Sequence, residues 1–253
     1  MRIPLVAANW KMNGTLDETG QLIKAMRPGL DAITGVEVVI CPPAMAITVA
    51  RVAVKGSAIK LGVQNIFHED RGAYTGELSA LMLKGVCDYV IVGHSERRLY
   101  FHEDDAAVNR KLKAALRHGL RPIFCVGESL EQRERGQTQE VIAGQVRQGL
   151  EGIPATPTLV IAYEPVWAIG SGRAATGAAA DAVCGLIRRT VAEGWGAPAA
   201  AALRVLYGGS VTAANAGEFL AQPEIDGALV GGASLRPPEF VAIVQEAARA
   251  KAA

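Results

Sequence analysis

The chain has 253 residues, half of them hydrophobic, which suffices for one domain of the size typical of an α/β barrel. Lysine and arginine number 26 against 25 aspartate and glutamate, so the net charge of +1 argues against a polyanion such as nucleic acid as the main partner. Any anionic ligand must be held by a local site.

The cysteines and the N-terminal segment indicate the compartment. The four cysteines are far apart and form no CxxC pair, so the sequence predicts neither a zinc cluster nor a disulfide framework. Asn9 and Lys11 interrupt the first apolar segment before a signal peptide could be completed, and no apolar run reaches the ~18 residues that span a bilayer. We therefore expect an unsecreted, cytoplasmic protein that does not enter membranes.

Eight short apolar runs alternate with longer segments of helical period. Their apolarity is nearly continuous, which is typical of strands in a parallel sheet covered by helices. In chain order the predicted strands are Leu5 to Trp10, Val36 to Cys41, Ile59 to Gln64, Tyr89 to Gly93, Pro122 to Val126, Leu159 to Tyr163, Leu203 to Tyr207 and Ala228 to Gly231.

The intervening helices show apolar stripes and end signals. Asp104 and Asp105 open a helix that is predicted to stop at Gly119, and Pro237 and Pro238 lie in the first turn of the last helix. The stripes are Val108, Leu112, Ala115 and Leu116; Val183, Leu186, Ile187 and Val191; and Phe240, Ile243, Val244 and Ala247. No linker divides residues 1–253, so we expect a single domain. Eight units in this length favour a closed barrel, although periodicity alone would also allow an open doubly wound sheet.

Polar or glycine-rich residues follow five of the predicted strands, at the ends that form one mouth in a barrel. They are Asn9 and Lys11, Gly93-His94-Ser95-Glu96, Glu164, Gly208-Gly209-Ser210, and Gly231-Gly232. Each group alone could have a structural role. Together they match one task, because removing a proton beside a carbonyl needs a base, a hydrogen-bond donor for the forming enediolate and a cation. Glu164, His94 and Lys11 can fill these roles, and the glycine-rich ends offer backbone N–H groups to a phosphate.

Six segments resemble the signature segments of the triosephosphate isomerase family, in family order and over nearly the whole chain. They are AANWKMN, GAYTGE, VGHSERR, AYEPVWAIG, YGGSV and GALVGGASL. The resemblance implies a closed (β/α)8 TIM barrel that interconverts glyceraldehyde 3-phosphate and dihydroxyacetone phosphate through an enediolate, in glycolysis and gluconeogenesis. It implies neither a cofactor nor a metal ion.

The same resemblance implies the residue roles. Glu164 is the base, His94 the electrophile and Lys11 the electrostatic partner, while Asn9 and Glu96 complete the catalytic set. The phosphate would be held at Gly170, Ser171, Ser210, Gly231 and Gly232. This family is itself the standard example of a histidine kept neutral by a helix N-terminus. Ser95 and Glu96, directly after His94, have the pattern of such a helix start.

Two loops are also covered by the resemblance. Residues Pro165 to Ala175 resemble the family's closing lid, although Ser171-Gly172-Arg173-Ala174 stands where the family commonly has Thr-Gly-Lys-Thr. Residues Gly72 to Glu77 resemble the loop by which each subunit inserts Thr75 beside the partner's Asn9 and Lys11. This implies a homodimer, and an exposed surface loop is the alternative.

Other interpretations remain open at this point. Another phosphate-binding barrel, such as a sugar-phosphate aldolase or a biosynthetic isomerase, would share the fold. A Schiff-base aldolase would need a desolvated lysine, for which Lys11 is the only candidate. A non-catalytic barrel that binds a partner would be expected to lose its base or electrophile. The triplets at 68–70 and 102–104 fit solvated loops better than metal sites, and Cys125 fits a packed thiol better than a nucleophile.

Overall fold

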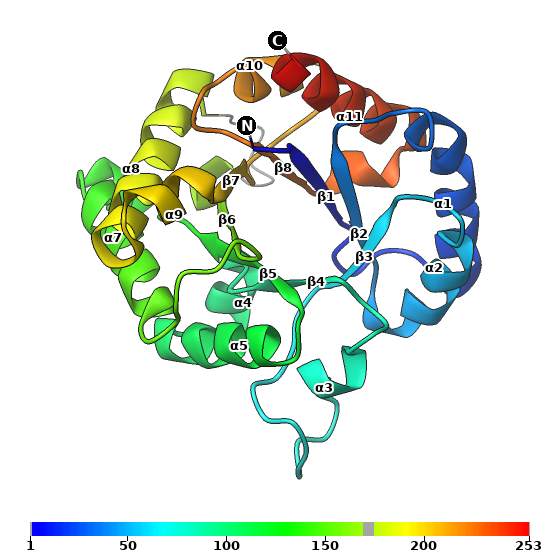
Figure 1. The fold of residues 1–253 in the computed structure, drawn as a ribbon, viewed down its shortest axis with the longest axis horizontal. Coiled ribbons are helices and arrows are strands. Elements are labelled where there is room, and N and C mark those ends of the chain that lie inside the picture. The colour runs from blue at the N-terminus through cyan, green and yellow to red at the C-terminus, as the bar shows by residue number, and fades with distance from the viewer. Residues whose placement is uncertain (1, 169–174, 253) are drawn as a thin grey trace.

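The computed structural model describes residues 2–168 and 175–252. Within these residues eight parallel strands form a closed ring in chain order, and helices surround the ring (Figure 1). Pairing of the first strand with the eighth, Leu5 with Gly227, closes the barrel. The closed (β/α)8 barrel is therefore confirmed, and the open doubly wound sheet is excluded.

All eight predicted strands are present, and their ends differ from the prediction by no more than one residue. The strands are β1 Leu5–Asn9, β2 Glu37–Cys41, β3 Lys60–Val63, β4 Tyr89–Val92, β5 Arg121–Val126, β6 Val160–Tyr163, β7 Arg204–Tyr207 and β8 Gly227–Val230. The α-helices are α1 Leu16–Leu30, α2 Ile47–Ala53, α3 Ala80–Leu83, α4 Ser95–Tyr100, α5 Asp105–Arg117, α6 Leu130–Glu134, α7 Thr138–Leu150, α8 Gly177–Trp195, α9 Ala197–Ala202, α10 Ala216–Leu220 and α11 Pro237–Ala252. Short 3-10 helices cover η1 Ala44–Ala46, η2 Val166–Ala168 and η3 Gly232–Leu235.

The end signals of the helices act as expected. Asp104 is the N-cap of α5, where its carboxylate accepts the Ala107 N–H at 2.7 Å. Gly119 follows this helix with φ of +79°, a backbone conformation that glycine adopts without strain. Pro237 begins α11. These local signals explain why single-sequence patterns located the helices well.

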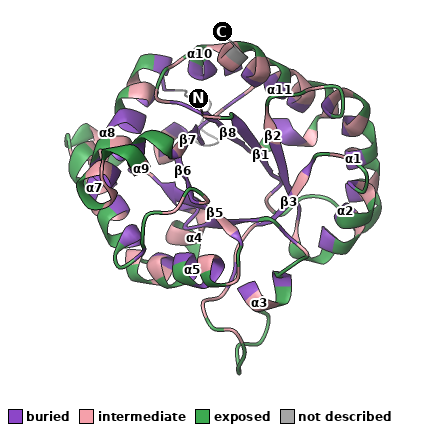
Figure 2. Ribbon diagram, viewed as in Figure 1, coloured by how far each residue is buried: buried purple, intermediate pink, exposed green. Residues whose placement is uncertain are grey.

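Alternate strand residues form two cores. One set points into the barrel and the other packs against the inner faces of the helices, so the strands and those helix faces are buried (Figure 2). The barrel interior contains Leu5, Ala7, Val39, Cys41, Tyr89, Ile91, Ile123, Cys125, Val160, Ala162, Leu206 and Leu229. A filled interior leaves the mouth formed by the C-terminal ends of the strands as the place for a site.

One segment departs from the ring. Between β3 and α3 the chain projects away from the barrel (Figure 1), and residues 71–77 are exposed. The rings of Phe67 and Tyr74 pack at 4.3 Å between centroids within this segment. Thr75 therefore lies on this exposed, projecting loop. Separately, none of the described helices combines the length and apolarity needed to cross a membrane.

Candidate active site

A cavity of about 480 Å³ opens at the C-terminal ends of the strands. Its lining includes eight of the residues singled out above: Asn9, Lys11, His94, Glu96, Glu164, Ser210, Gly231 and Gly232. The fold therefore brings together residues that are more than 200 positions apart in the sequence. Gly170 and Ser171, the two lid positions expected to hold phosphate, lie outside the described residues, as does the Arg173-Ala174 departure.

Glu164 follows β6 and is 2% exposed. Its Oε1 lies 2.9 Å from His94 Nε2, and its Oε2 accepts the Ser95 N–H at 2.9 Å. Burial raises the pKa of this carboxyl, but the charge and hydrogen bond of His94 and the Ser95 N–H lower it further, so the net pKa lies below its usual value. The carboxylate is thus ionised and held at the cavity wall.

His94 is the N-cap residue of α4, so the predicted helix start after it is confirmed. Its Nδ1 accepts the Glu96 N–H at 3.2 Å. Burial lowers the pKa of His94, but contact with the Glu164 carboxylate raises it above its ordinary value. The expectation of an imidazole with a lowered pKa is therefore wrong while Glu164 touches Nε2, because the nearby carboxylate outweighs the effect of burial on the pKa of His94. The Glu96 N–H still favours an unprotonated Nδ1. If the Glu164 carboxylate moved away, burial and this hydrogen bond would therefore determine the pKa of His94.

Lys11 is fixed in a conformation that most residues avoid, with φ of +52°. Two hydrogen bonds hold its backbone: its N–H donates to Asn9 Oδ1 at 3.1 Å, and its carbonyl accepts from Gln64 Nε2 at 2.8 Å. The ammonium group forms an ion pair with Glu96 Oε1 at 2.6 Å. Sequence reasoning missed Gln64, which also donates to the Cys41 carbonyl at 2.9 Å, although its place at the end of a predicted strand was a usable signal.

Glycines shape the cavity wall around Glu164. A Cβ on Gly208 would lie 2.9 Å from Glu164 Cγ, so glycine at this position lets Glu164 pack against the strand end. A Cβ on Gly232 would meet no atom within 4 Å, and this residue begins η3. Bare backbone at Gly231 and Gly232 thus lines the cavity beside Lys11, as an anion site requires.

Glu128 is a further residue that sequence reasoning missed. This fully buried carboxylate lies on the loop after β5, where Oε1 accepts the Tyr163 hydroxyl at 3.0 Å and the Trp167 Nε1–H at 3.1 Å. Arg133 forms an ion pair with the same oxygen at 3.2 Å. Trp167 lies in the segment that resembles the lid, so Glu128 ties the start of that segment to the barrel.

In each of the two triplets that the sequence analysis rejected as metal sites, an acidic residue forms ion pairs with basic side chains. Asp70 binds Arg117 and His118, each at 2.7 Å. Glu103 forms ion pairs with Arg97 and Lys111, each at 2.5 Å. Burial, together with the charge of Glu164, raises the pKa of the Cys125 thiol well above its usual value, which makes it a poor nucleophile.

Comparison with known proteins settles the relationship that the site suggests. The family model for triosephosphate isomerase matches residues 4–247. The chain belongs to the triosephosphate isomerase family. It is 50% identical over 248 residues to the triosephosphate isomerase of Dehalococcoides mccartyi, with 98% of each chain covered. It is 53% identical to that of Dictyoglomus thermophilum, covering 97% of this chain and 100% of the relative. It is 54% identical to that of Moorella thermoacetica, covering 96% and 98%. As a member of the triosephosphate isomerase family, the chain is an isomerase.

Proposed function

We propose that this cavity interconverts glyceraldehyde 3-phosphate and dihydroxyacetone phosphate, with Glu164 as the base that moves the proton. The observation that carries the proposal is the contact between Glu164 and His94 at the cavity wall, 2.9 Å apart. A carboxylate and an imidazole at this spacing can act on two adjacent carbon atoms of one small substrate. In the cell, this reaction serves glycolysis and gluconeogenesis.

The chemistry follows from which groups are ionised. Glu164 leaves His94 and Ser95 when substrate enters, and its carboxylate removes the proton from the carbon beside the carbonyl. The electron pair of that C–H bond forms the enediolate double bond, and the carbonyl oxygen gains negative charge. His94 Nε2–H donates to this oxygen, and the Lys11 ammonium stabilises its charge. His94 then gives its Nε2 proton to this oxygen and takes the proton of the adjacent hydroxyl, so the negative charge moves to the second oxygen. That oxygen becomes the new carbonyl oxygen as Glu164 returns its proton to the neighbouring carbon, which completes the isomerisation.

The remaining residues position the substrate. Asn9 and Glu96 hold Lys11, through its N–H and its ammonium group respectively. Backbone N–H groups at Ser210, Gly231 and Gly232 bind the phosphate in this proposal, which is supported by the position of these residues in the cavity lining without bulky side chains. Gly170 and Ser171 would add the lid's contribution.

The activity is tested by supplying glyceraldehyde 3-phosphate to the purified chain and measuring dihydroxyacetone phosphate with a coupled reductase. In deuterated water, product should carry deuterium at the carbon that exchanges its proton, because the base removes and returns a proton there. A pure chain that produces no dihydroxyacetone phosphate would overturn the proposal. Borohydride treatment with substrate tests the aldolase alternative: a covalent adduct at Lys11 would favour it, whereas the ion pair between Lys11 and Glu96 predicts none.

We also propose that the active form is a homodimer in which Thr75 completes the partner's site. Thr75 stands on the projecting loop, and a second cavity of about 410 Å³ borders Lys11 and Met12 beside the first. Met12 is 95% exposed, and Phe101, also at this cavity, is 62% exposed. Exposed apolar side chains around a hollow are typical of a surface that another chain covers. The four buried free thiols support the cytoplasm as the compartment.

Dilution tests the assembly. Specific activity, measured alongside sedimentation, should fall as monomer forms, while circular dichroism shows that the monomer remains folded. A folded monomer with the activity of the dimer would remove Thr75 from the mechanism.

A further inference from the structure

The side-chain amide of Gln145 forms two hydrogen bonds with the backbone of Gly127, one through its oxygen and one through its nitrogen. Its Oε1 accepts the Gly127 N–H at 2.8 Å, and its Nε2 donates to the Gly127 carbonyl at 3.1 Å. Gln145 lies on α7, outside the barrel, whereas Gly127 directly follows the last residue of β5. The amide therefore satisfies both backbone groups at the point where strand pairing ends, as a neighbouring strand would.

Gly127 in turn lies directly against the backbone of the base. A Cβ on Gly127 would lie 1.8 Å from the Glu164 carbonyl oxygen, so the two backbones are in closest contact. On either side of this contact, the Glu164 N–H donates to the Val126 carbonyl at 2.8 Å and the Val166 N–H donates to the Glu128 carbonyl at 3.2 Å. A shift of Gly127 toward β6 would therefore displace Glu164, because no space separates them.

The same short segment also holds the beginning of the lid-like loop. Glu128, the next residue, accepts hydrogen bonds from the Tyr163 hydroxyl and from Trp167 Nε1. Residues 127 and 128 thus contact the base on one side and the first residues after it on the other. The only brace from outside the barrel that the described contacts give to the Gly127 backbone is the Gln145 amide.

We infer that Gln145 is a positioning residue for Glu164: it fixes Gly127, and Gly127 fixes the backbone from which the base projects. Gln145 does not line the cavity, so it acts on the reaction through this backbone and not by touching substrate. The inference rests on the proposed function, since it assigns Gln145 to the base of that reaction. Small displacements of a catalytic group are costly, with about 10²-fold in rate for roughly 1 Å.

The test compares three variants of the full chain at a temperature well below each variant's melting point. Gln145→Leu removes both hydrogen bonds with little change in side-chain size, and kcat should fall about tenfold, less than the loss expected for a full ångström of displacement. Gln145→Glu keeps the acceptor and loses the donor, so its kcat should lie between those of Gln145→Leu and the parent. Gln148→Leu is the matched control, because Gln148 is exposed on the same helix, and its kcat should match the parent.

Binding measurements separate positioning from general damage. The KM of Gln145→Leu should stay within about twofold of the parent, because the phosphate contacts after β7 and β8 are untouched. Inhibition by glycerol 3-phosphate, which has the phosphate but no carbonyl, should be equally unchanged. A structural defect of the whole mouth would weaken this inhibition along with kcat.

The outcomes are distinct from those of the function assay. An active parent with a Gln145→Leu kcat within about twofold of it overturns the inference and leaves the function standing. A parallel loss of kcat and of glycerol 3-phosphate inhibition also overturns it. An inactive parent overturns the function and this inference together. If Gln145→Leu does not fold, Gln145→Glu decides alone, and an unchanged kcat in that variant overturns the inference.

Discussion

Both ends of the barrel carry charged side chains, but the surroundings of these side chains differ between the two ends. At the N-terminal ends of the strands, charged groups bind one another and the backbone until their hydrogen-bonding groups are occupied. At the C-terminal ends, His94 contacts Glu164 and Lys11 pairs with Glu96, and all four residues also border a cavity of about 480 Å³. Charged groups at both ends have partners, so the open cavity beside those at the C-terminal end is what distinguishes the candidate site from the structural clusters.

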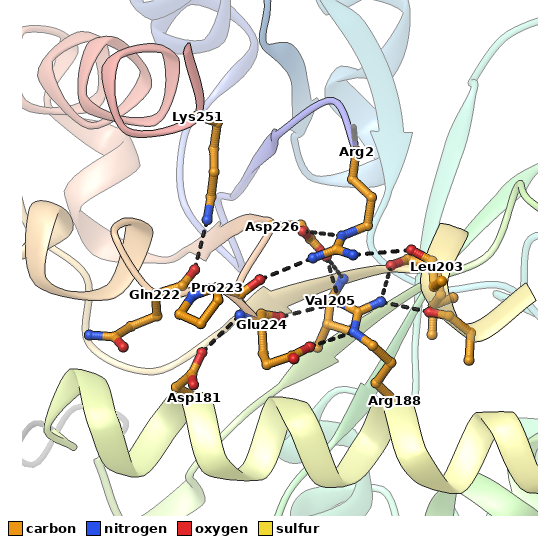
Figure 3. Close-up of polar contacts among 12 residues, drawn as sticks. Arg2, Asp181, Arg188, Leu203, Val205, Gln222, Pro223, Glu224, Asp226 and Lys251 are labelled. Carbon is orange, nitrogen blue, oxygen red and sulfur yellow. Dashed lines mark hydrogen bonds and ion pairs between the residues drawn. The ribbon is translucent and has the colours of Figure 1, made fainter. Parts of the chain in front are cut away.

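At the N-terminal ends of the strands, one cluster of charged residues forms hydrogen bonds and ion pairs around Asp226. Asp226 is 3% exposed and accepts from Arg2 Nε at 2.5 Å, from Arg188 Nη2 at 3.0 Å and from the Val205 N–H at 2.9 Å (Figure 3). Arg188 also donates to the carbonyls of Ala200 and Leu203, each at 2.7 Å. This cluster joins α8, the start of β7 and the residues before β1 and β8.

A second cluster of polar side chains covers the barrel interior at the same end. Glu37 binds Arg204 at 2.6 Å and Arg121 at 3.0 Å, and the Tyr89 hydroxyl accepts from Arg204 at 3.0 Å. Each of these residues is the first of its strand. The group forms one polar layer below the apolar interior, and its charges satisfy each other instead of a ligand.

The largest effect expected at the C-terminal end follows removal of the proposed base. Glu164→Gln should lower kcat by at least about 10²-fold, because the amide cannot accept the proton. KM should change much less, and steady-state kinetics measures both. A melting temperature like that of the parent serves as the control for folding. A near-native kcat would falsify the assignment of the base and break the contrast between the two ends.

At the N-terminal end the effect should appear in stability instead. Asp226→Ala leaves Arg188, whose side chain is 12% exposed, without one of its carboxylates, and should lower the free energy of unfolding by about 3 kcal/mol. Denaturant unfolding measures this, and kcat at a temperature where the variant is folded should be unchanged. Arg147→Ala is the control, because its pair with Glu193 is more than half exposed on both sides and should contribute little. A large loss of kcat in Asp226→Ala would show that the two ends are not independent.

The smallest effect concerns the pKa of His94. In the free protein this pKa should lie above 6.5, because Glu164 touches Nε2. Its contribution to stability is then present below pH 6.5 and is lost as the pH rises through the raised pKa. Glu164→Gln should lower the pKa of His94, since burial would then dominate, and NMR titration of the imidazole measures the change. A pKa that stays the same in the variant would show that Glu164 does not control His94.

The sequence predicted the fold, and it also predicted most of the residues that line the candidate site, for physical reasons. Strands buried on both faces are nearly continuous apolar runs, and the polar residues after them interrupt that pattern, so Lys11, His94 and Glu164 stood out. Glu128 and Gln145 did not, because their roles depend on contacts between elements: a carboxylate and an amide are common on surface helices and loops. The pKa of His94 was also beyond sequence reasoning, since it depends on where the carboxylate of Glu164 rests.

Closure of the ring by β1 and β8 has a consequence for synthesis of the chain. Leu5 pairs with Gly227, so one edge of β1 has no partner until more than 220 further residues have been made. At ribosomal speeds this interval is on the order of tens of seconds. During that time the nascent sheet exposes an apolar edge that is able to pair with other chains. The growing polypeptide is therefore most prone to aggregate just before its last strand emerges, and chaperones that shield strand edges should act on it at that stage.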